Sequence, residues 1–176
     1  MKVTLVMLST VDGKIVKWED GDTYSWNSAE DKKHFDSFVK EAKLIVMGSK
    51  TFEVAKPSPK EGVLRIVLTS NPDQYKAMEI PGMLEFTNED PATLVAKLAK
   101  LGYKDLLLVG GGGVNTTFFQ ANLVDTLWLT IEPKIFGKGK MIVSQVPMDV
   151  ELKLEMLKQL NKQGTLLLRY SVVKKP

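Results

Sequence analysis

Short apolar runs that end in small or polar residues most constrain what this chain can fold into. Four of them are rich in aliphatic and β-branched residues and predict buried strands: Lys2 to Leu8, Leu44 to Met47, Leu64 to Leu68 and Leu106 to Val109. Segments with apolar residues at helical spacing lie between them. This alternation is typical of a mainly parallel sheet with helices on both faces.

Turn and cap residues place the helices between these strands. Ser28 predicts the start of a first helix, and Glu89-Asp90-Pro91 caps another that runs to about Leu101. Two further helices are expected at Lys50 to Ala55 and at Val114 to Ala121. A weaker strand is expected at Met83 to Phe86.

The C-terminal part of the chain breaks the alternation. Thr126 to Ile131 predicts a strand, and Glu151 to Leu160 and Thr165 to Val173 predict two more, joined around Asn161 to Gly164. We therefore expect an α/β fold of three αβα layers, whose mainly parallel twisted sheet carries a C-terminal antiparallel hairpin. At 176 residues, a single domain over residues 1–176 is expected.

Composition excludes several classes of function. The chain has no cysteine and only one histidine, His34, so disulfides, thiolate catalysis and a metal site are not expected. The net charge of +3 comes from interspersed residues, which suits a small anionic ligand and does not favour nucleic acid. No apolar run has the length of a membrane span, and the run Val3 to Leu8 is too short for a signal-peptide core. We expect a cytoplasmic protein that binds no membrane.

Gly110, Gly111, Gly112 and Gly113 separate a predicted strand from a predicted helix. Such a turn presents backbone N–H groups at a helix N-terminus, an arrangement that binds phosphate. Three other strand ends carry small, hydroxyl or lysine residues: Ser9-Thr10, Gly48-Ser49-Lys50-Thr51 and Thr69-Ser70-Asn71. Ligands of parallel sheets bind at the carboxyl ends of the strands, so we predict a site for a molecule with several phosphates. The glycine spacing matches neither G-x-G-x-x-G nor a Walker A loop.

Five motifs in order resemble the dihydrofolate-reductase-like superfamily, and nearest to it the C-terminal reductase domain of the bifunctional riboflavin-biosynthesis deaminase-reductase. They are Ser9 to Ile15, Val46 to Phe52, Val109 to Val114, Leu123 to Asp125 and Pro133 to Gly139. The resemblance covers nearly the whole chain and implies one reductase domain. The deaminase half, with its zinc signature, has no counterpart in this sequence.

This resemblance implies NADPH as cofactor and assigns binding residues by position. Ser9, Thr10 and Ile15 would lie near the nicotinamide, and Gly48, Ser49, Lys50 and Thr51 would open a helix against the phosphates. Leu68, Thr69 and Ser70 would border the adenosine ribose and its 2′-phosphate. Gly110 to Gly113 and Val114 would hold the pyrophosphate, with a cis peptide bond between the first two glycines.

Asp31 is the candidate proton donor, because reduction of an imine or carbonyl needs a proton as well as a hydride. It lies near the position of the acidic residue of dihydrofolate reductases. The alternative is that Asp31 only completes a capping box with Ser28. Trp26 and Phe35 are candidates for the walls of a substrate pocket, although Phe35 also suits the core.

The substrate stays open at this point. Riboflavin reductases typically carry glutamate directly before the glycines, where this chain has Val109, and dihydrofolate reductases commonly carry arginine where it has Ser49. The leading hypothesis is an NADPH-dependent reductase of a small heterocycle or ribosylamino-pyrimidine, such as 5-amino-6-(5-phosphoribosylamino)uracil. Dihydrofolate reduction is the enzyme alternative, and an NADPH-binding module without turnover is the other. The resemblance also implies a homodimer.

Overall fold

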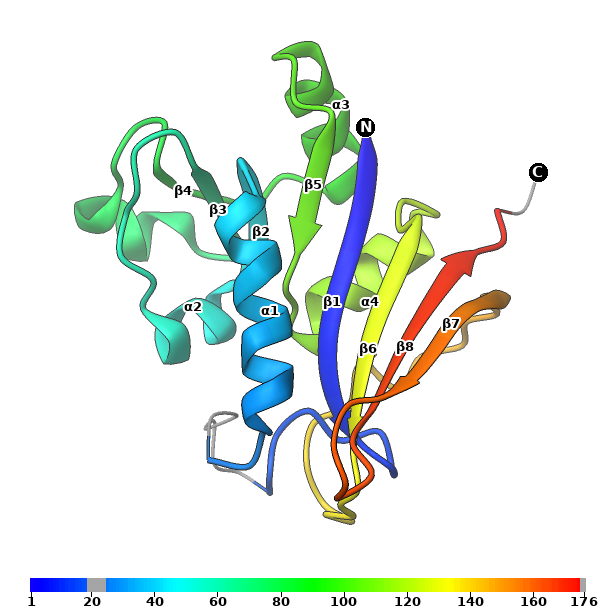
Figure 1. Cartoon of the computed structure of the whole chain (residues 1–176). Coiled ribbons are helices and arrows are strands. Elements are labelled where there is room, and N and C mark those ends of the chain that lie inside the picture. The colour runs from blue at the N-terminus through cyan, green and yellow to red at the C-terminus, as the bar shows by residue number, and fades with distance from the viewer. Residues whose placement is uncertain (19–24, 175–176) are drawn as a thin grey trace.

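The computed structural model describes residues 1–18 and 25–174, and its strands form one eight-stranded sheet in the order β4-β3-β2-β5-β1-β6-β8-β7 (Figure 1). The strands are β1 (Lys2–Thr10), β2 (Leu44–Gly48), β3 (Leu64–Leu68), β4 (Leu84–Thr87), β5 (Asp105–Leu108), β6 (Thr126–Glu132), β7 (Leu152–Gln159) and β8 (Leu166–Val172). β1 pairs in parallel with both β5 and β6. β8 pairs antiparallel with β6 and β7, so the predicted C-terminal hairpin is confirmed.

Two helices, α1 (Ala29–Glu41) and α3 (Pro91–Lys100), begin where the sequence places their caps. The other helices are α2 (Ser49–Ala55) and α4 (Gly112–Gln120), and a 3₁₀ helix, η1 (Pro72–Met78), follows β3. The Ser28 side chain accepts a hydrogen bond from the backbone N–H of Asp31, and Asp90 accepts from the N–H groups of Ala92 and Thr93. Each cap satisfies amide donors that the first helical turn leaves without a partner.

Two apolar clusters cover the two faces of the sheet. Val3, Leu5 and Met7 of β1 pack on one face, with Leu94 and Leu98 of α3 and Phe118 and Phe119 of α4. Val6 faces the other way and packs with Ile45, Phe52 of α2 and Phe35 and Phe38 of α1. Figure 1 shows α1 in front of the sheet and α4 behind it. The predicted three-layer αβα arrangement is confirmed.

Two element boundaries differ from the prediction by two residues, and several others differ by one. β1 continues to Thr10, two residues beyond the expected end, because its ladder with β6 extends to the pair Thr10↔Glu132. Ser9 and Thr10 therefore belong to the buried strand itself. α4 begins at Gly112 rather than Val114, so the last two glycines form its first turn.

Candidate active site

A cavity of about 670 Å³ lies at the carboxyl ends of β1, β2, β3 and β5. It gathers most of the residues that the sequence singled out. Those that line it are Ile15, Asp31, Phe35, Gly48, Ser49, Lys50, Thr51, Leu68, Thr69, Ser70, Gly111, Gly112, Gly113 and Val114. Five segments far apart in the chain thus meet in one space, as expected for the carboxyl edge of a parallel sheet.

Four candidate residues do not line this cavity: Ser9, Thr10, Gly110 and Trp26. The Thr10 hydroxyl donates to Asp12 Oδ1 at 2.5 Å and accepts from the N–H of Lys14, so it organises the following turn. Trp26 is buried, with its ring edge-on to Phe136 at 5.1 Å between centroids. Phe35 has both expected roles, because it packs on the core and also lines the cavity.

Two helices present uncapped N-termini to the cavity. α2 starts after Gly48 and α4 after Gly111, and neither N-cap residue makes a side-chain hydrogen bond to the helix. By contrast, side chains cap α1 and α3. The cap of α1, Ser28, lies beside Asp31, and the cap of α3, Asp90, lies outside this edge of the sheet. An uncapped helix N-terminus leaves amide donors and a partial positive charge for an anion. Lys50 and Lys140 add cationic side chains to the lining of the same cavity.

The glycine run has several distinct roles. The Gly110–Gly111 peptide bond is cis, as the resemblance implied, and Gly110 has a φ of 92°, in the left-handed region that favours glycine. A Cβ on Gly112 would lie 2.4 Å from the carbonyl oxygen of Met141, so this glycine allows two backbone segments to pack. A Cβ on Gly113 would meet nothing within 4 Å. Of these glycines, Gly113 is the one whose missing side chain leaves open space beside the cavity.

Asp31 is a buried carboxyl group in the first turn of α1, 6% exposed, and it lines the cavity. Burial raises the pKa of Asp31 above its ordinary value of 3.8, and the negative charge of Glu132 raises it further. Hydrogen bonds from the side chains of Thr130 and Asn27 act in the opposite direction. A carboxyl group held this way keeps its proton to higher pH than an exposed one, which suits a general acid.

The capping-box interpretation of Asp31 is wrong. In a capping box the acidic side chain accepts from the backbone N–H of the N-cap residue. Here the N–H of Ser28 donates instead to Glu132 Oε1 at 2.7 Å. Glu132 is 3% exposed, and its other oxygen accepts from the Thr165 hydroxyl at 2.7 Å. The Asp31 carboxyl is therefore left facing the cavity, with no role in capping its own helix.

Sequence reasoning missed Asn27, Thr130, Glu132 and Arg65 as site residues. Thr130 and Glu132 sit on β6, and only the pairing of β6 with β1 and β8 brings them under α1. Arg65 interrupts an apolar strand pattern, which was the available signal. It is 6% exposed and lines the cavity.

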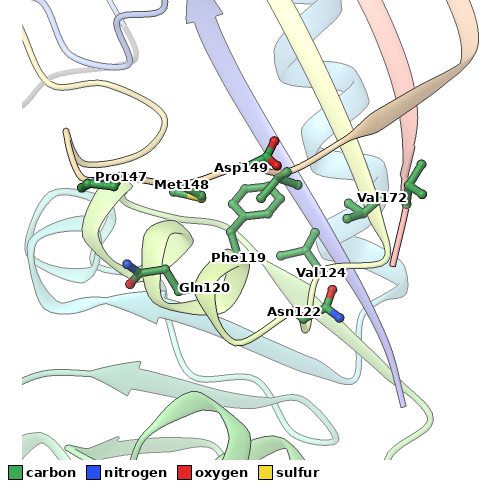
Figure 2. A pocket seen from close by; sticks show the side chains of 10 residues that line it. Phe119, Gln120, Asn122, Val124, Pro147, Met148, Asp149 and Val172 are labelled. Carbon is green, nitrogen blue, oxygen red and sulfur yellow. The ribbon is translucent and has the colours of Figure 1, made fainter. Parts of the chain in front are cut away.

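A second cavity, of about 490 Å³, lies at the opposite end of the parallel strands (Figure 2). Its walls come from the end of α4, the segment 147–150 and the end of β8, and Phe119, Val124, Met148 and Val172 make much of the lining apolar. None of the candidate residues reaches it. Within residues 1–18 and 25–174, no three or more potential metal ligands gather at one place.

Residues 1–166 match the family described as RibD C-terminal domain. The chain belongs to this family. The dihydrofolate-reductase-like resemblance is thereby confirmed.

Two relatives come from Bacillus subtilis (strain 168), and both are described as uncharacterized. The chain is 26% identical to YyaP over 163 residues, covering 87% of this chain and 86% of YyaP. It is 24% identical to YwjB over 164 residues, covering 90% and 91% of the two chains.

Solved structures share the fold at lower identity. A putative riboflavin biosynthesis protein from Shewanella sp. PV-4 superposes with a TM-score of 0.80 at 16% identity, covering 98% of this chain and 99% of that one. A pyrimidine reductase-like protein from Corynebacterium diphtheriae gives 0.78 at 16% identity, covering 99% and 92%. A diaminohydroxyphosphoribosylaminopyrimidine deaminase/5-amino-6-(5-phosphoribosylamino)uracil reductase from Thermotoga maritima gives 0.76 at 19% identity, and this chain covers 56% of it.

Among the described residues, no helix has the length and apolarity to span a membrane.

Proposed function

We propose that this protein is an NADPH-dependent reductase that delivers hydride to a C=N or C=O bond of a small heterocycle. The observation that carries the proposal is one cavity in which two uncapped helix N-termini meet a buried carboxyl group. The helix ends suit the phosphates of a dinucleotide, and the carboxyl group suits a proton donor. Family membership and the reductase named for the Thermotoga maritima structure support the same class of reaction.

The residues present fit such a cofactor. Open space beside Gly113 lets a phosphate approach the backbone of α4, and Ser49, Lys50 and Thr51 form the facing wall. Leu68, Thr69 and Ser70 would border the adenosine ribose and its 2′-phosphate, and Ile15 would lie beside the nicotinamide. When bound, NADPH supplies the hydride. Asp31 holds the proton that goes to the nitrogen or oxygen of the reduced bond, and the apolar walls exclude water.

The substrate we favour is a ribosylamino-pyrimidine such as 5-amino-6-(5-phosphoribosylamino)uracil. Dihydrofolate is the second candidate, favoured by the buried Asp31 on α1 and by Val109, which lines the cavity where the riboflavin branch has glutamate. A cytoplasmic location, a single domain and a homodimer remain predictions.

The test is NADPH oxidation, followed by absorbance, with each candidate substrate added separately. We expect turnover with one of the two and a loss of about 100-fold or more in the Asp31→Asn variant, the usual scale for a general acid. Tight NADPH binding without oxidation by any pterin or pyrimidine would show a binding module instead. Failure to bind NADPH at all would overturn the proposal.

A further inference from the structure

Asn115 and Thr116 are polar side chains buried in α4, and neither lines the candidate active site. Asn115 is 0% exposed and Thr116 is 6% exposed. The Asn115 Nδ2 group donates to the carbonyl oxygen of Ile142 at 2.8 Å, and the Thr116 hydroxyl accepts from the N–H of Ser144 at 2.7 Å. Both side chains therefore bind the main chain of one distant segment, residues 138–144, which we call the strap.

The strap contains little regular structure, so its main-chain groups need partners elsewhere. On one side it packs against α4, where the carbonyl oxygen of Met141 occupies the space that a Cβ on Gly112 would need. The two side chains of α4 supply partners to a carbonyl group of the strap and to an N–H group two residues later. The strap is therefore held on α4 at two points.

The other side of the strap holds a wall of the candidate active site. The N–H of Ile15 donates to the carbonyl oxygen of Lys140 at 2.8 Å. A Cβ on Gly139 would collide with the carbonyl oxygen of Val16, so these two backbones are in close contact. Ile15, Val16 and Lys140 all line the cavity. The place of this wall relative to the glycine turn, Gly110 to Gly113, therefore depends on the strap.

We propose that Asn115 and Thr116 are positioning residues, which hold the wall of Ile15 and Val16 at a fixed place relative to the glycine turn. A ligand whose phosphates bind at the first turn of α4 orders the helix that carries both side chains, and the strap passes this order to the main chain of Ile15. Misplacement of a reacting group by about 1 Å can cost roughly 100-fold in rate. This inference rests on the proposed reductase function for its effect on rate, whereas its effect on the strap does not depend on turnover.

Three substitutions and one control separate the positioning role from ordinary packing. Thr116→Val keeps the shape of the side chain and removes the hydroxyl, whereas Thr116→Ser keeps the hydroxyl. Asn115→Ala removes the Nδ2 donor together with Oδ1, a buried acceptor without a partner in the described part of the chain, so the loss of stability is partly offset. Thr117→Val is the matched control, because Thr117 is exposed on the same helix and its hydroxyl donates to the carbonyl oxygen of Val114.

The first measurement is amide hydrogen exchange in residues 11–18, with and without ADP-ribose 2′-phosphate, which carries the phosphates of NADPH but no nicotinamide. In wild type we expect this ligand to slow exchange of the Ile15 N–H by about 5-fold or more, the lower end of coupling between sites. In Thr116→Val and Asn115→Ala the slowing should fall below about 2-fold, while the Kd of the ligand, measured by calorimetry, stays within about 3-fold of wild type. Thr116→Ser and Thr117→Val should behave as wild type.

The second measurement is NADPH oxidation with the proven substrate. We expect kcat to fall by about 10- to 100-fold in Thr116→Val and Asn115→Ala, with KM for NADPH within about 3-fold of wild type, because the phosphate site on α4 is intact and only the wall is displaced. Thr116→Ser should restore kcat, and Thr117→Val should leave it unchanged.

A purely structural role would lower the melting temperature of Thr116→Val and Asn115→Ala but leave kcat and the slowed exchange at Ile15 as in wild type, which would overturn the proposal. Ligand binding to wild type without slower exchange at Ile15, or a Kd that weakens as much as kcat falls, would overturn it as well. If the ligand does not bind wild type, the reductase function fails, and exchange without ligand decides on the positioning role. Faster exchange at Ile15 in Thr116→Val than in Thr117→Val supports that role, and equal exchange overturns it.

Discussion

At the scale of single residues, Asp31 is the group whose surroundings most alter its chemistry. Its carboxyl is buried beside the charge of Glu132, while Thr130 and Asn27 hold its orientation by hydrogen bonds. The pKa of Asp31 is raised above 3.8, chiefly by burial. Activity and stability should therefore both depend on the protonation of this one side chain, in ways that can be separated.

For activity, the acid form of Asp31 is the active one. We expect kcat/KM with the proven substrate to fall as pH rises through the raised pKa of Asp31, because fewer molecules then carry the proton. A pH–rate profile checks this. Glu132→Gln removes a neighbouring negative charge, so it should lower the pKa of Asp31 and move the falling limb to lower pH. A limb that stays in place in Glu132→Gln would contradict the electrostatic role given to Glu132.

For stability, the same shift has a definite sign. The folded state binds the Asp31 proton more tightly than the unfolded chain, so the free energy of unfolding falls as pH rises from 3.8 through the pKa of the folded protein. Asp31→Asn has no proton to lose, so it should unfold at a higher temperature than wild type at neutral pH and lose this advantage in acid. Thermal unfolding over a pH series measures it. Glu41→Gln, exposed at the end of the same helix, is the control and should show no such pH-dependent difference.

At the scale of elements, α2 and α4 differ from the helices that side chains cap. No side chain caps their N-termini, so the N–H groups there can bind a ligand. Of the two glycines at the start of α4, one allows close packing and the other allows a ligand to approach. Gly112 packs its backbone against the Met141 carbonyl, whereas Gly113 borders open space. One consecutive pair of glycines thus offers a matched experiment.

The Gly112→Ala and Gly113→Ala variants should behave oppositely. A Cβ at Gly112 would lie 2.4 Å from a backbone oxygen, so this variant should be destabilised and should lower the melting temperature. Gly113→Ala meets nothing within 4 Å and replaces a helical glycine, which favours the folded state by roughly 0.5–1 kcal/mol. It should nevertheless weaken NADPH binding, measured by fluorescence titration. Unchanged affinity in Gly113→Ala would place the phosphates elsewhere.

Glu132 joins three elements, because it accepts from Ser28 before α1 and from Thr165 before β8 while lying at the end of β6. Glu132→Ala should lower the free energy of unfolding by about 2–3 kcal/mol, since it leaves two donors without their charged acceptor. Denaturant unfolding measures the loss. Glu155→Gln, an exposed glutamate on β7, is the control and should unfold like wild type.

How well each feature could be predicted depends on whether neighbouring or distant residues determine it. Ser28 and Asp90 cap the helices that they predicted, because a cap acts within one turn of chain. Arg65 and Glu132 were not predicted as site residues, because their burial depends on partners tens of residues away. Trp26 was expected in a substrate wall, but the later loop residue Phe136 covers it. Local structure was readable from the sequence, whereas the site residues that depend on strand pairing were not.

At the scale of the whole molecule, the proposed cofactor should stabilise the fold, because the cavity walls come from four strand ends and three helices. A ligand at 100 times its Kd stabilises the folded state by about 2.7 kcal/mol. NADPH should raise the melting temperature more than NADH at equal concentration, and added salt should reduce the difference, because the 2′-phosphate contact is electrostatic. Asp31→Asn should respond to NADPH as wild type does. Equal shifts with both nucleotides would contradict the assigned 2′-phosphate contacts of Thr69 and Ser70.

The central position of β1 also has a consequence for synthesis. The first strand to leave the ribosome is flanked by β5 and β6, whose residues begin at Asp105 and Thr126. At about 5–20 residues per second, an apolar strand therefore waits several seconds without either neighbour. Pairing over such sequence separations is slow. The nascent chain should depend on chaperones or on rapid completion of β5 and β6, and a chain stalled before Asp105 should be prone to aggregate.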